Sequence, residues 1–278
     1  MSAMTDIATA LGWAKQRIDL MEARVLLRHV LQCPASRLIA WPESILAQED
    51  WARYRELVAR REAGEPVAYL TGEREFYGRE FMVTPAVLIP RPDTELLVEL
   101  AVAHVSGMHR PRLLDMGTGS GALAITLALE LEGADVTAID RSREALWVAM
   151  ANAARLGASV SFVQSDWFAG LGEERFQLIV SNPPYIASAD EHLEQGDLRF
   201  EPRTALAAGP AGLDDLAEIV ARAPVHLEAE GWLLLEHGYD QASAVRGLLA
   251  DAGFAAIASW KDLAGIERVS GGRWLGRV

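Results

Sequence analysis

The chain has 278 residues, half of them apolar, with a formal net charge of −13 and a single cysteine. This length suits one large domain or two domains, and one cysteine excludes an internal disulfide and a cysteine-rich metal site. No basic leader precedes a continuous apolar stretch, and the longest apolar run, Ala122–Leu129 with one threonine, is too short to cross a bilayer. We therefore expect a soluble, cytoplasmic protein with no membrane partner.

The charge is unevenly distributed along the chain. Residues 1–75 hold 10 Lys or Arg and 11 Asp or Glu, whereas residues 76–278 hold 16 and 28. Such an acidic surface repels a phosphate backbone unless its arginines are concentrated in one cleft. The composition therefore argues against nucleic acid as a partner.

The first part of the chain has a helical pattern. From Thr5 to about Gly64, apolar residues recur at three- and four-residue spacing, as in LMEARVLLRHVL and WARYRELVARRE. Prolines 34 and 42 divide the pattern, which predicts a small helical bundle. We expect three tryptophans to pack in its core: Trp13, Trp41 and Trp51.

A short segment of a different pattern follows. Gly72–Pro85 alternates charged with aromatic or aliphatic residues around Gly78, which predicts a β-hairpin. We therefore predict a helical domain at residues 1–75, a β-hairpin linker at 76–85 and a second domain at 86–278.

Beyond Arg110, short apolar runs alternate with amphipathic helices. The runs are RLLDM, ADVTAID, SVSFVQSD, FQLIVSN and GWLLLEH, and one helix, SREALWVAMANAARLG, begins with Ser142 as its N-cap. This alternation predicts an open, mostly parallel α/β sheet with helices on both faces. The runs FAAIASW and ERVSGGRWLGRV have no helix between them and predict an antiparallel pair at the sheet edge.

The stretch LLDMGTGSGALAI, Leu113–Ile125, predicts a buried strand, a glycine-rich turn and a helix. Glycines 117, 119 and 121 let the backbone turn sharply and approach a ligand without a Cβ in the way. In such sheets the ligand lies at the carboxyl ends of the strands, where the strand order reverses.

The glycine turn is compatible with two cofactors. Gly117, Gly119 and Ala122 satisfy the G-x-G-x-x-G/A fingerprint of dinucleotide binding, so a nicotinamide oxidoreductase is one interpretation. Asp115, just before the first glycine, would oppose a pyrophosphate but suits a cationic ligand. S-adenosylmethionine, a sulfonium with an amino-acid tail, meets that description.

The next two strand ends add polar and aromatic groups. Asp140 ends the second strand and is placed to accept hydrogen bonds from ribose hydroxyls. After the third strand, Asp166 is an acceptor for an adenine amino group and Trp167 a cover for the adenine face. The alternative for these two residues is a strand-end turn with a core tryptophan.

The fourth strand ends in SNPPY. The Asn182 amide has two donors and an acceptor, and the carbonyl of Pro183 adds an acceptor on a backbone stiffened by Pro183 and Pro184. Two fixed acceptors suit a planar NH₂ group, with the Tyr185 ring packed on it and its nitrogen aimed at the sulfonium methyl. Such a nitrogen is a weak nucleophile, so alignment and electrostatics carry the catalysis and the proton leaves late. A proline-rich loop with a buried asparagine cap is the alternative.

Two further segments receive structural interpretations. In IPRPDTE we expect a proline-braced helix start with Asp93 or Thr94 as N-cap. In DEHLEQGDLRFEPR we expect the carboxylates around His192 to be solvated, and we predict no metal site.

Taken together, DMGTGSG and SNPPY resemble the methyltransferases that modify planar NH₂ groups, which include adenine-N6 DNA enzymes and protein glutamine methyltransferases. The N-terminal helical segment, LIPRPDTELLVE, SDWF and LRFEPRTALAAGPAGLD extend the resemblance over nearly the whole chain, to the HemK-type peptide-chain release factor glutamine methyltransferases (the PrmC/HemK family). Met116 stands where leucine is usual in that family, a volume-conserving difference.

The resemblance implies a Rossmann-like, class I S-adenosylmethionine-dependent methyltransferase with an N-terminal helical domain that helps to grip its substrate. The reaction would transfer a methyl group to the side-chain amide N5 of the glutamine in the Gly-Gly-Gln motif of class-one release factors, leaving S-adenosylhomocysteine. The implied cofactor-binding residues are Gly117, Thr118, Gly119, Ser120, Gly121, Asp140, Trp167 and Asn182. The residues implied to hold the glutamine are Asn182, Pro183, Pro184 and Tyr185, of which Asn182, Pro183 and Tyr185 are the catalytic set.

Four alternatives stay open. A ribosomal-protein glutamine methyltransferase shares the chemistry, but IPRPDTE and RFEPRTAL favour the release-factor branch. An adenine-N6 DNA methyltransferase shares the amine pocket, but the acidic second domain suits DNA badly. A nicotinamide oxidoreductase leaves NPPY unexplained, and a non-catalytic cofactor-binding scaffold is the fourth possibility.

Overall fold

The computed structural model describes residues 5–276 and divides into two compact units. The first comprises Met1–Glu73 and Gly196–Phe200, and the second comprises Arg74–Gln195 and Glu201–Val278. The predicted domain boundaries, at residues 75 and 85, did not anticipate that residues 196–200 belong to the first unit. Residues 1–4 and 277–278, the extreme ends of the predicted domains, lie outside the described residues.

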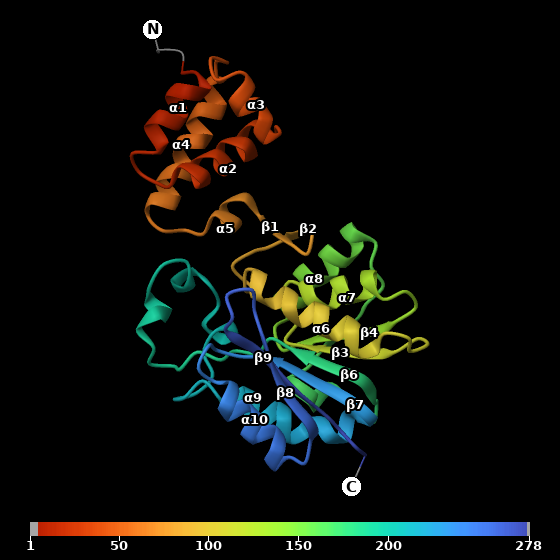
Figure 1. Ribbon diagram of the computed structural model, residues 1–278. Coiled ribbons are helices and arrows are strands. Elements are labelled where there is room, and N and C mark those ends of the chain that lie inside the picture. The colour runs from red at the N-terminus through yellow and green to blue at the C-terminus, as the bar shows by residue number, and fades with distance from the viewer. Residues whose placement is uncertain (1–4, 277–278) are drawn as a thin grey trace. The chain divides into compact units, whose positions relative to one another are not determined.

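The first unit is a bundle of helices (Figure 1). They are α1 (Ile7–Ala14), α2 (Leu20–Leu31), α3 (Ala35–Ala40), α4 (Gln48–Glu62) and α5 (Val67–Thr71). Aspartates start the first two: Asp6 accepts from the backbone N–H of Thr9 at 2.7 Å, and Asp19 accepts from that of Met21 at 2.7 Å. The predicted helical bundle is confirmed.

The tryptophans of the bundle do not all lie in its core. Trp13 and Trp51 pack against the apolar cluster with their ring centroids 5.2 Å apart, in an edge-to-face arrangement. Trp41 is 56% exposed, so its predicted core position is wrong. The short helix α3 ends at Ala40, and Trp41 has a non-helical backbone, so its side chain leaves the apolar face of that helix.

A two-stranded hairpin opens the second unit's part of the chain. Strands β1 (Glu73–Phe76) and β2 (Arg79–Met82) are joined through Tyr77 and Gly78, whose φ angles are 51° and 74°. Positive φ at both turn residues is the signature of a tight turn that matches strand twist. The hairpin is confirmed, although its first strand begins before the predicted linker at 76–85.

A seven-stranded sheet forms the centre of the second unit, in the order β5-β4-β3-β6-β7-β9-β8. Its strands are β3 (Arg112–Met116), β4 (Asp135–Asp140), β5 (Ser161–Gln164), β6 (Phe176–Ser181), β7 (Leu227–Glu236), β8 (Ala255–Lys261) and β9 (Glu267–Arg273). Neighbours from β5 to β7 pair in parallel, and β9 is antiparallel to both β7 and β8. Both the parallel sheet and the antiparallel pair at its edge are confirmed. The last two residues of the predicted final run lie outside the described part of the chain.

Helices cover both faces of this sheet (Figure 1). One face carries α6 (Glu95–Val105), α7 (Ala122–Glu130) and α8 (Arg143–Leu156), and the other carries α9 (Asp214–Arg222) and α10 (Ala242–Asp251). Each layer has its own apolar cluster, represented by Leu97 and Leu123 on one face and by Leu216 and Leu249 on the other. The central strands are therefore buried on both sides, which accounts for their continuous apolar sequences.

The strand order reverses beside β3. The chain runs from β3 outward through β4 to β5, and then returns to the other side of β3 with β6 and β7. All five strands are parallel, so their carboxyl ends lie at one edge of the sheet, where a crevice forms at the reversal. Asp140 ends one of these strands, and the glycine turn, Asp166 and Asn182 follow the ends of three others.

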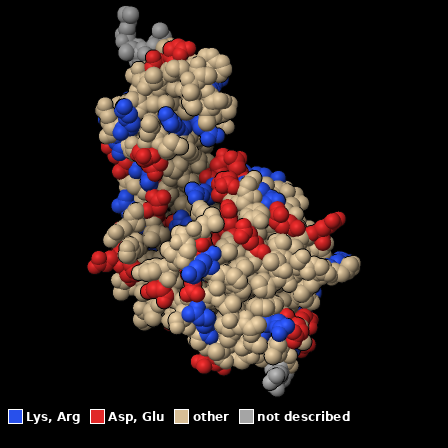
Figure 2. Space-filling model, viewed as in Figure 1, with Lys and Arg blue, Asp and Glu red and all other residues tan. Residues whose placement is uncertain are grey.

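Charged side chains of both signs are dispersed over the face shown in Figure 2, where Lys and Arg form no continuous basic surface. Within residues 5–276, no helix has both the length and the apolar character that a bilayer crossing requires.

The two-sided burial of β7 generates a stability prediction. Leu233→Ala removes a fully buried side chain from this strand and should lower the free energy of unfolding by about 2–5 kcal/mol, measured by urea denaturation. The same substitution at Leu263, which is fully exposed, should change it by less than about 0.5 kcal/mol. Equal losses in the two variants would contradict the placement of the core.

Candidate functional site

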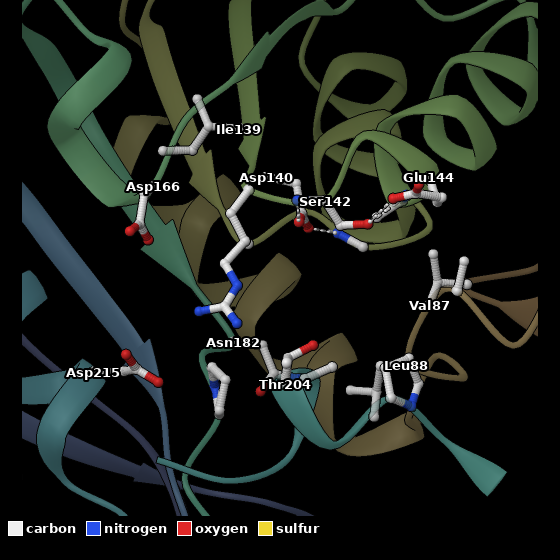
Figure 3. Close-up of a pocket in the computed structure, with 18 of the residues that line it drawn as sticks. Val87, Leu88, Ile139, Asp140, Ser142, Glu144, Asp166, Asn182, Thr204 and Asp215 are labelled. Carbon is white, nitrogen blue, oxygen red and sulfur yellow. Dashed lines mark hydrogen bonds between the residues drawn. The ribbon is translucent and has the colours of Figure 1, made fainter. Parts of the chain in front are cut away.

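A cavity of about 310 Å³ opens at the carboxyl ends of the parallel strands (Figure 3). The residues predicted for the site that line it are Gly117, Gly119, Asp140, Asp166, Trp167, Asn182 and Pro184. A smaller cavity of about 60 Å³ shares Leu88, Gly117, Gly119 and Asn182 with the first. Asp115, Thr118 and Ser120 line this smaller cavity, together with Arg91 and Thr94.

The glycine turn is tied to the end of the neighbouring strand. The backbone N–H groups of Gly117 and Thr118 both donate to the carbonyl of Ile139, each at 2.9 Å. Gly117 has a φ of 73°, and a Cβ there would lie 3.6 Å from the ring of Trp167. The turn therefore places bare backbone against an aromatic ring at the cavity wall.

Gly121 differs from the other two glycines of the turn. It precedes α7 with a φ of 82°, and a Cβ would lie 2.7 Å from Cδ1 of Ile125 and 3.1 Å from Cβ of Ala149. It lines neither cavity. Its lack of a side chain serves the packing of α7 against α8, while its assignment to the cofactor stays a prediction.

Asp115 braces the turn from inside. It is 2% exposed, and its Oδ2 accepts from the hydroxyl of Thr118 at 2.7 Å and from the N–H of Ala124 at 3.2 Å. Burial raises the pKa of this carboxyl to about 7, against the lowering effect of its two hydrogen bonds. Asp115 thus fixes the loop as well as placing a carboxyl at the smaller cavity.

Asp140, at the end of β4, joins the glycine turn to the start of α8. Its Oδ2 accepts from the N–H of Gly119 at 3.0 Å, and its Oδ1 accepts from that of Ser142 at 2.8 Å. Burial raises its pKa, and these two hydrogen bonds act in the opposite direction. Each carboxylate oxygen has more than one lone-pair site, so the group keeps acceptor capacity toward the cavity. Ser142 caps α8 as predicted, accepting from Ala145 at 3.1 Å.

Trp167 follows β5 with a φ of 45°, in the left-handed region that few bulky residues adopt. Its Nε1 donates to Oδ1 of Asp215 at 3.3 Å, and both residues line the larger cavity. Asp166, exposed beside it, lines the same cavity. The unusual backbone directs the indole over Gly117, so the ring forms a cavity wall as well as packing on the apolar cluster beneath.

Asn182 is oriented by a residue from another part of the chain. Its Nδ2 donates to Oγ1 of Thr94 at 3.0 Å, which leaves Oδ1 as the free acceptor end of the amide. Thr94 occupies the N-cap position of α6, but its side chain makes no capping hydrogen bond. The prediction that Asp93 or Thr94 only caps a helix was therefore incomplete: Thr94 contacts the candidate catalytic asparagine.

The rest of the SNPPY segment lies at different depths. Pro184 lines the larger cavity, and Pro183 is buried and lines neither cavity. Tyr185 is half-buried and lines neither cavity; its hydroxyl is 3.4 Å from Oε1 of Glu236. Nε2 of Gln241 donates to the carbonyl of Tyr185 at 2.9 Å, which fixes the backbone after the prolines.

An ion pair that the sequence did not predict joins the segments IPRPDTE and RFEPRTAL. Arg91 donates to Oε1 of Glu201, whose Oε2 accepts from the N–H of Ile89 at 3.0 Å. Leu88 and Thr204 beside this pair line the larger cavity (Figure 3). The segments IPRPDTE and RFEPRTAL thus contact each other. The family resemblance includes both segments, and this was the one signal in the sequence that they belong together.

A second missed residue is Asn152 of α8, which is fully buried. Its Oδ1 accepts from the N–H of Met82 at 2.7 Å, and its Nδ2 donates to the carbonyls of Met82 and Ser120, each at 2.9 Å. It therefore fastens the hairpin to the glycine turn. An asparagine on the apolar face of a predicted helix was the available signal.

The acidic segment around His192 is open to solvent. Nδ1 of His192 lies 2.7 Å from Oδ1 of Asp190, and the histidine side chain is 77% exposed. In the described part of the chain, no group of three or more His, Cys, Asp or Glu side chains is arranged to hold a metal ion.

The burial of Asp115 generates a prediction about pH. Burial raises its pKa in the folded state to about 7, against an ordinary 3.8. Between these two pH values the folded state binds the proton more tightly than the unfolded state does, so the free energy of unfolding falls as pH rises. Asp115→Asn removes that loss, so its free energy of unfolding relative to wild type should increase by up to about 1.4 kcal/mol per pH unit from pH 5 toward 7. Urea denaturation at several pH values measures it, and a constant difference would contradict the assignment.

Comparisons with known proteins bear on the family and the fold of the chain. Two family models match: "PrmC N-terminal domain" over residues 3–72 and "Methyltransferase small domain" over residues 92–198. The T. thermophilus 16S rRNA N2 G1207 methyltransferase, solved with AdoMet and guanosine, has a TM-score of 0.54 at 22% identity, over 73% of this chain and 49% of that one. This likeness concerns the fold, and it supports the predicted class I methyltransferase sheet.

Two curated relatives cover nearly the full length. The release factor glutamine methyltransferase of Bordetella pertussis is 53% identical over 253 residues, 91% of this chain and 94% of that protein. The protein of the same name from Shewanella oneidensis is 42% identical over 285 residues, 100% of this chain and 99% of its own length. The resemblance noted in the sequence is therefore confirmed, and the chain belongs to the release factor glutamine methyltransferase family.

Proposed function

We propose that the protein transfers a methyl group from S-adenosylmethionine to the side-chain amide N5 of the glutamine in the Gly-Gly-Gln motif of class-one peptide-chain release factors. The observation that carries the proposal is Asn182, which lies at the cavity with its Nδ2 bonded to Thr94 and its Oδ1 left as an acceptor. An acceptor held in this way suits a planar NH₂ group. Membership of the family supports glutamine as the group that carries it.

The two adjoining cavities fit the parts of S-adenosylmethionine. Asp140 offers acceptors for ribose hydroxyls, and Trp167 and Asp166 lie where an adenine ring would be held. In the smaller cavity, Arg91 offers a cation for the carboxylate and Asp115 an anion for the ammonium group. The remaining proposed contacts are Gly117, Thr118, Ser120 and Gly121 of the glycine turn. When bound, the cofactor supplies the electrophilic methyl group and leaves as S-adenosylhomocysteine.

The chain's own residues would align the glutamine. Oδ1 of Asn182 and the carbonyl of Pro183 accept the two N–H hydrogens of the substrate amide, and Pro184 and Tyr185 bound its plane. Accepting both hydrogens fixes the nitrogen and excludes water from it, which is how positioning lowers the barrier for a weak nucleophile. The amide loses a proton only after methylation has made it acidic.

We propose that the helical domain, residues 1–75, contributes to binding of the release factor, with residues 76–85 as linker and 86–278 as the methyltransferase domain. Its nearly balanced charge fits contact with a protein better than the acidic remainder does. The protein would act in the cytoplasm, where translation terminates. The acidic remainder argues against nucleic acid as the substrate.

A labelling assay tests this function. Purified protein is incubated with methyl-labelled S-adenosylmethionine and a release factor carrying Gly-Gly-Gln or Gly-Gly-Ala. We expect label in the first substrate alone. Equal labelling of both would refute glutamine methylation, and label in a ribosomal protein alone would support that branch instead. Cofactor binding with no transfer would support a scaffold, and tight NAD binding with none to S-adenosylmethionine would support an oxidoreductase.

Removal of the asparagine side chain tests the amide pocket. Asn182→Ala should lower kcat for methylation by about 10²–10³ at saturating S-adenosylmethionine, because an aligned acceptor is lost. Thermal unfolding should change little, because Asn182 is half-buried in a strand-end turn outside both apolar clusters. Wild-type turnover in this variant would show that the pocket is assigned to the wrong residue.

A further inference from the structure

Trp167 has a backbone conformation that bulky residues rarely adopt. Its φ of 45° lies in the left-handed region, which disfavours large side chains. Six non-glycine residues between residues 5 and 276 have a positive φ, and Trp167 is the one among them that lines either cavity. Such strain persists only where the surrounding contacts fix it, and it is concentrated at functional sites. The contacts that hold Trp167 therefore bear on what the cavity binds.

Ser165 holds the backbone of this turn. Its hydroxyl donates to the carbonyl of Trp167 and accepts from the N–H of Gly170 at 2.7 Å. Ser165 is 5% exposed, and a Cβ at Gly170 would lie 2.9 Å from its Oγ, so the glycine leaves room for the hydroxyl. The N–H of Ser165 donates to the carbonyl of Asp140 at 3.0 Å. The strained backbone is thus tied to the ends of two strands of the sheet.

Asp215, in the first turn of α9, holds the indole. Its Oδ1 accepts from Nε1 of Trp167 at 3.3 Å, and this N–H is the one donor of the side chain. At the other end of the indole, the six-membered ring approaches Gly117, where a Cβ would lie 3.6 Å from Cζ3 and 3.8 Å from Cη2. Rotation of the ring about χ2 would break the hydrogen bond. The indole is therefore held in one orientation at the cavity wall.

Asp215 is itself a cavity residue, lining the larger cavity together with Trp167 (Figure 3). Such a carboxylate has three candidate roles: to hold the indole, to attract a cationic ligand by its charge, or to stabilise the N-terminus of α9. That helix has Leu213 as its N-cap residue, which makes no side-chain hydrogen bond. The strained backbone of Trp167 favours the first role, because neither of the other two requires the indole at this wall.

We propose that Asp215 is a positioning residue for the cofactor: by accepting the indole N–H, it fixes the face of Trp167 against the adenine base of S-adenosylmethionine. This inference rests on the proposed function and adds a residue to its adenine pocket. A ring that is fixed before the ligand enters loses no side-chain freedom on binding, which raises affinity for a planar base. Adenine does not change during methyl transfer, so the gain belongs to KM and not to kcat.

The test measures, by calorimetry on the ligand-free protein, the dissociation constants of S-adenosylmethionine and S-adenosylhomocysteine. The second ligand has the same adenosine without the positive sulfonium. Wild type is compared with Asp215→Ala, Asp215→Asn, Trp167→Phe and the double variant Trp167→Phe with Asp215→Ala. Asparagine keeps an acceptor and removes the charge, whereas phenylalanine keeps a ring and removes the N–H.

A matched control comes from the same helix. Glu218 is exposed on α9 and lines neither cavity, so Glu218→Ala removes a negative charge from the helix without touching the site. Thermal unfolding monitors the fold of every variant. The kcat and KM for methylation of a Gly-Gly-Gln release factor are measured on the same proteins.

We expect Asp215→Ala to raise both dissociation constants about 5–20-fold, because the freed indole no longer presents its face to adenine. The KM for S-adenosylmethionine should rise by a similar factor, while kcat at saturating cofactor stays within about twofold of wild type. Asp215→Asn and Glu218→Ala should bind both ligands within about twofold of wild type. Trp167→Phe should also lose affinity, and Asp215→Ala should cause no further loss in that background, because the two residues act as one unit.

Several outcomes would overturn the inference. Equal losses in Asp215→Ala and Asp215→Asn, or a loss for S-adenosylmethionine alone, would assign the effect to charge. Additive losses in the double variant would mean that Asp215 acts independently of Trp167. A lowered kcat with an unchanged KM would exclude a role in cofactor binding. If Asp215→Ala does not fold, the two conservative variants decide: lowered affinity in Trp167→Phe with retained affinity in Asp215→Asn supports the inference, and any other combination refutes it.

Failure of the proposed function gives a different result. Wild type that binds neither ligand refutes the proposed function and this inference with it. Wild type that binds both ligands but leaves Gly-Gly-Gln unlabelled refutes the function alone, while the dissociation constants still test Asp215. Wild type that binds and labels the release factor, with Asp215→Ala indistinguishable from it, refutes this inference alone.

Discussion

The reversal of strand order beside β3 is the constraint on which the rest of the second unit depends. The strands β3 to β7 are parallel and are added on both sides of β3, so five strand ends lie at one edge of the sheet and a crevice forms where the order reverses. The glycine turn, Asp140, Trp167 and Asn182 are distant in sequence, yet each needs only to follow its strand to reach the same cavity. The strand order thus brings these residues together, and the turns after the strands carry the polar and aromatic groups of the site.

Two buried carboxyl groups lower the stability of the fold as pH rises. Asp115 and Glu236 are both buried carboxyl groups with pKa values raised to about 7, so each disfavours the native state at higher pH. The hydrogen bonds that Asp115 accepts from Thr118 and Ala124 offset part of this loss and hold the glycine turn in place. Glu236 has an oxygen with no hydrogen-bond partner among the described residues, so less of the cost of its burial is offset.

The cavity walls depend on contacts between distant segments. Glu201 joins Arg91 and the backbone of Ile89, so the segment before α6 and the loop after SNPPY are fixed together. Asn152 does the same for the hairpin and the glycine turn. Loops at such a site are mobile unless cross-bonded, and these polar bridges preorganise the walls before a ligand enters.

The sequence by itself determined the helical bundle, the hairpin, the strands, the glycine turn and the family, because each rests on periodicity, turn chemistry or contiguous motifs. Local pattern also identified Ser142 as a cap. It misplaced Trp41 and treated Thr94 as a cap alone, because burial and side-chain partners are set by elements far along the chain. Only the tertiary structure decided that Asn182 meets Thr94 and that Arg91 meets Glu201, since those neighbours exist only after the strands have paired.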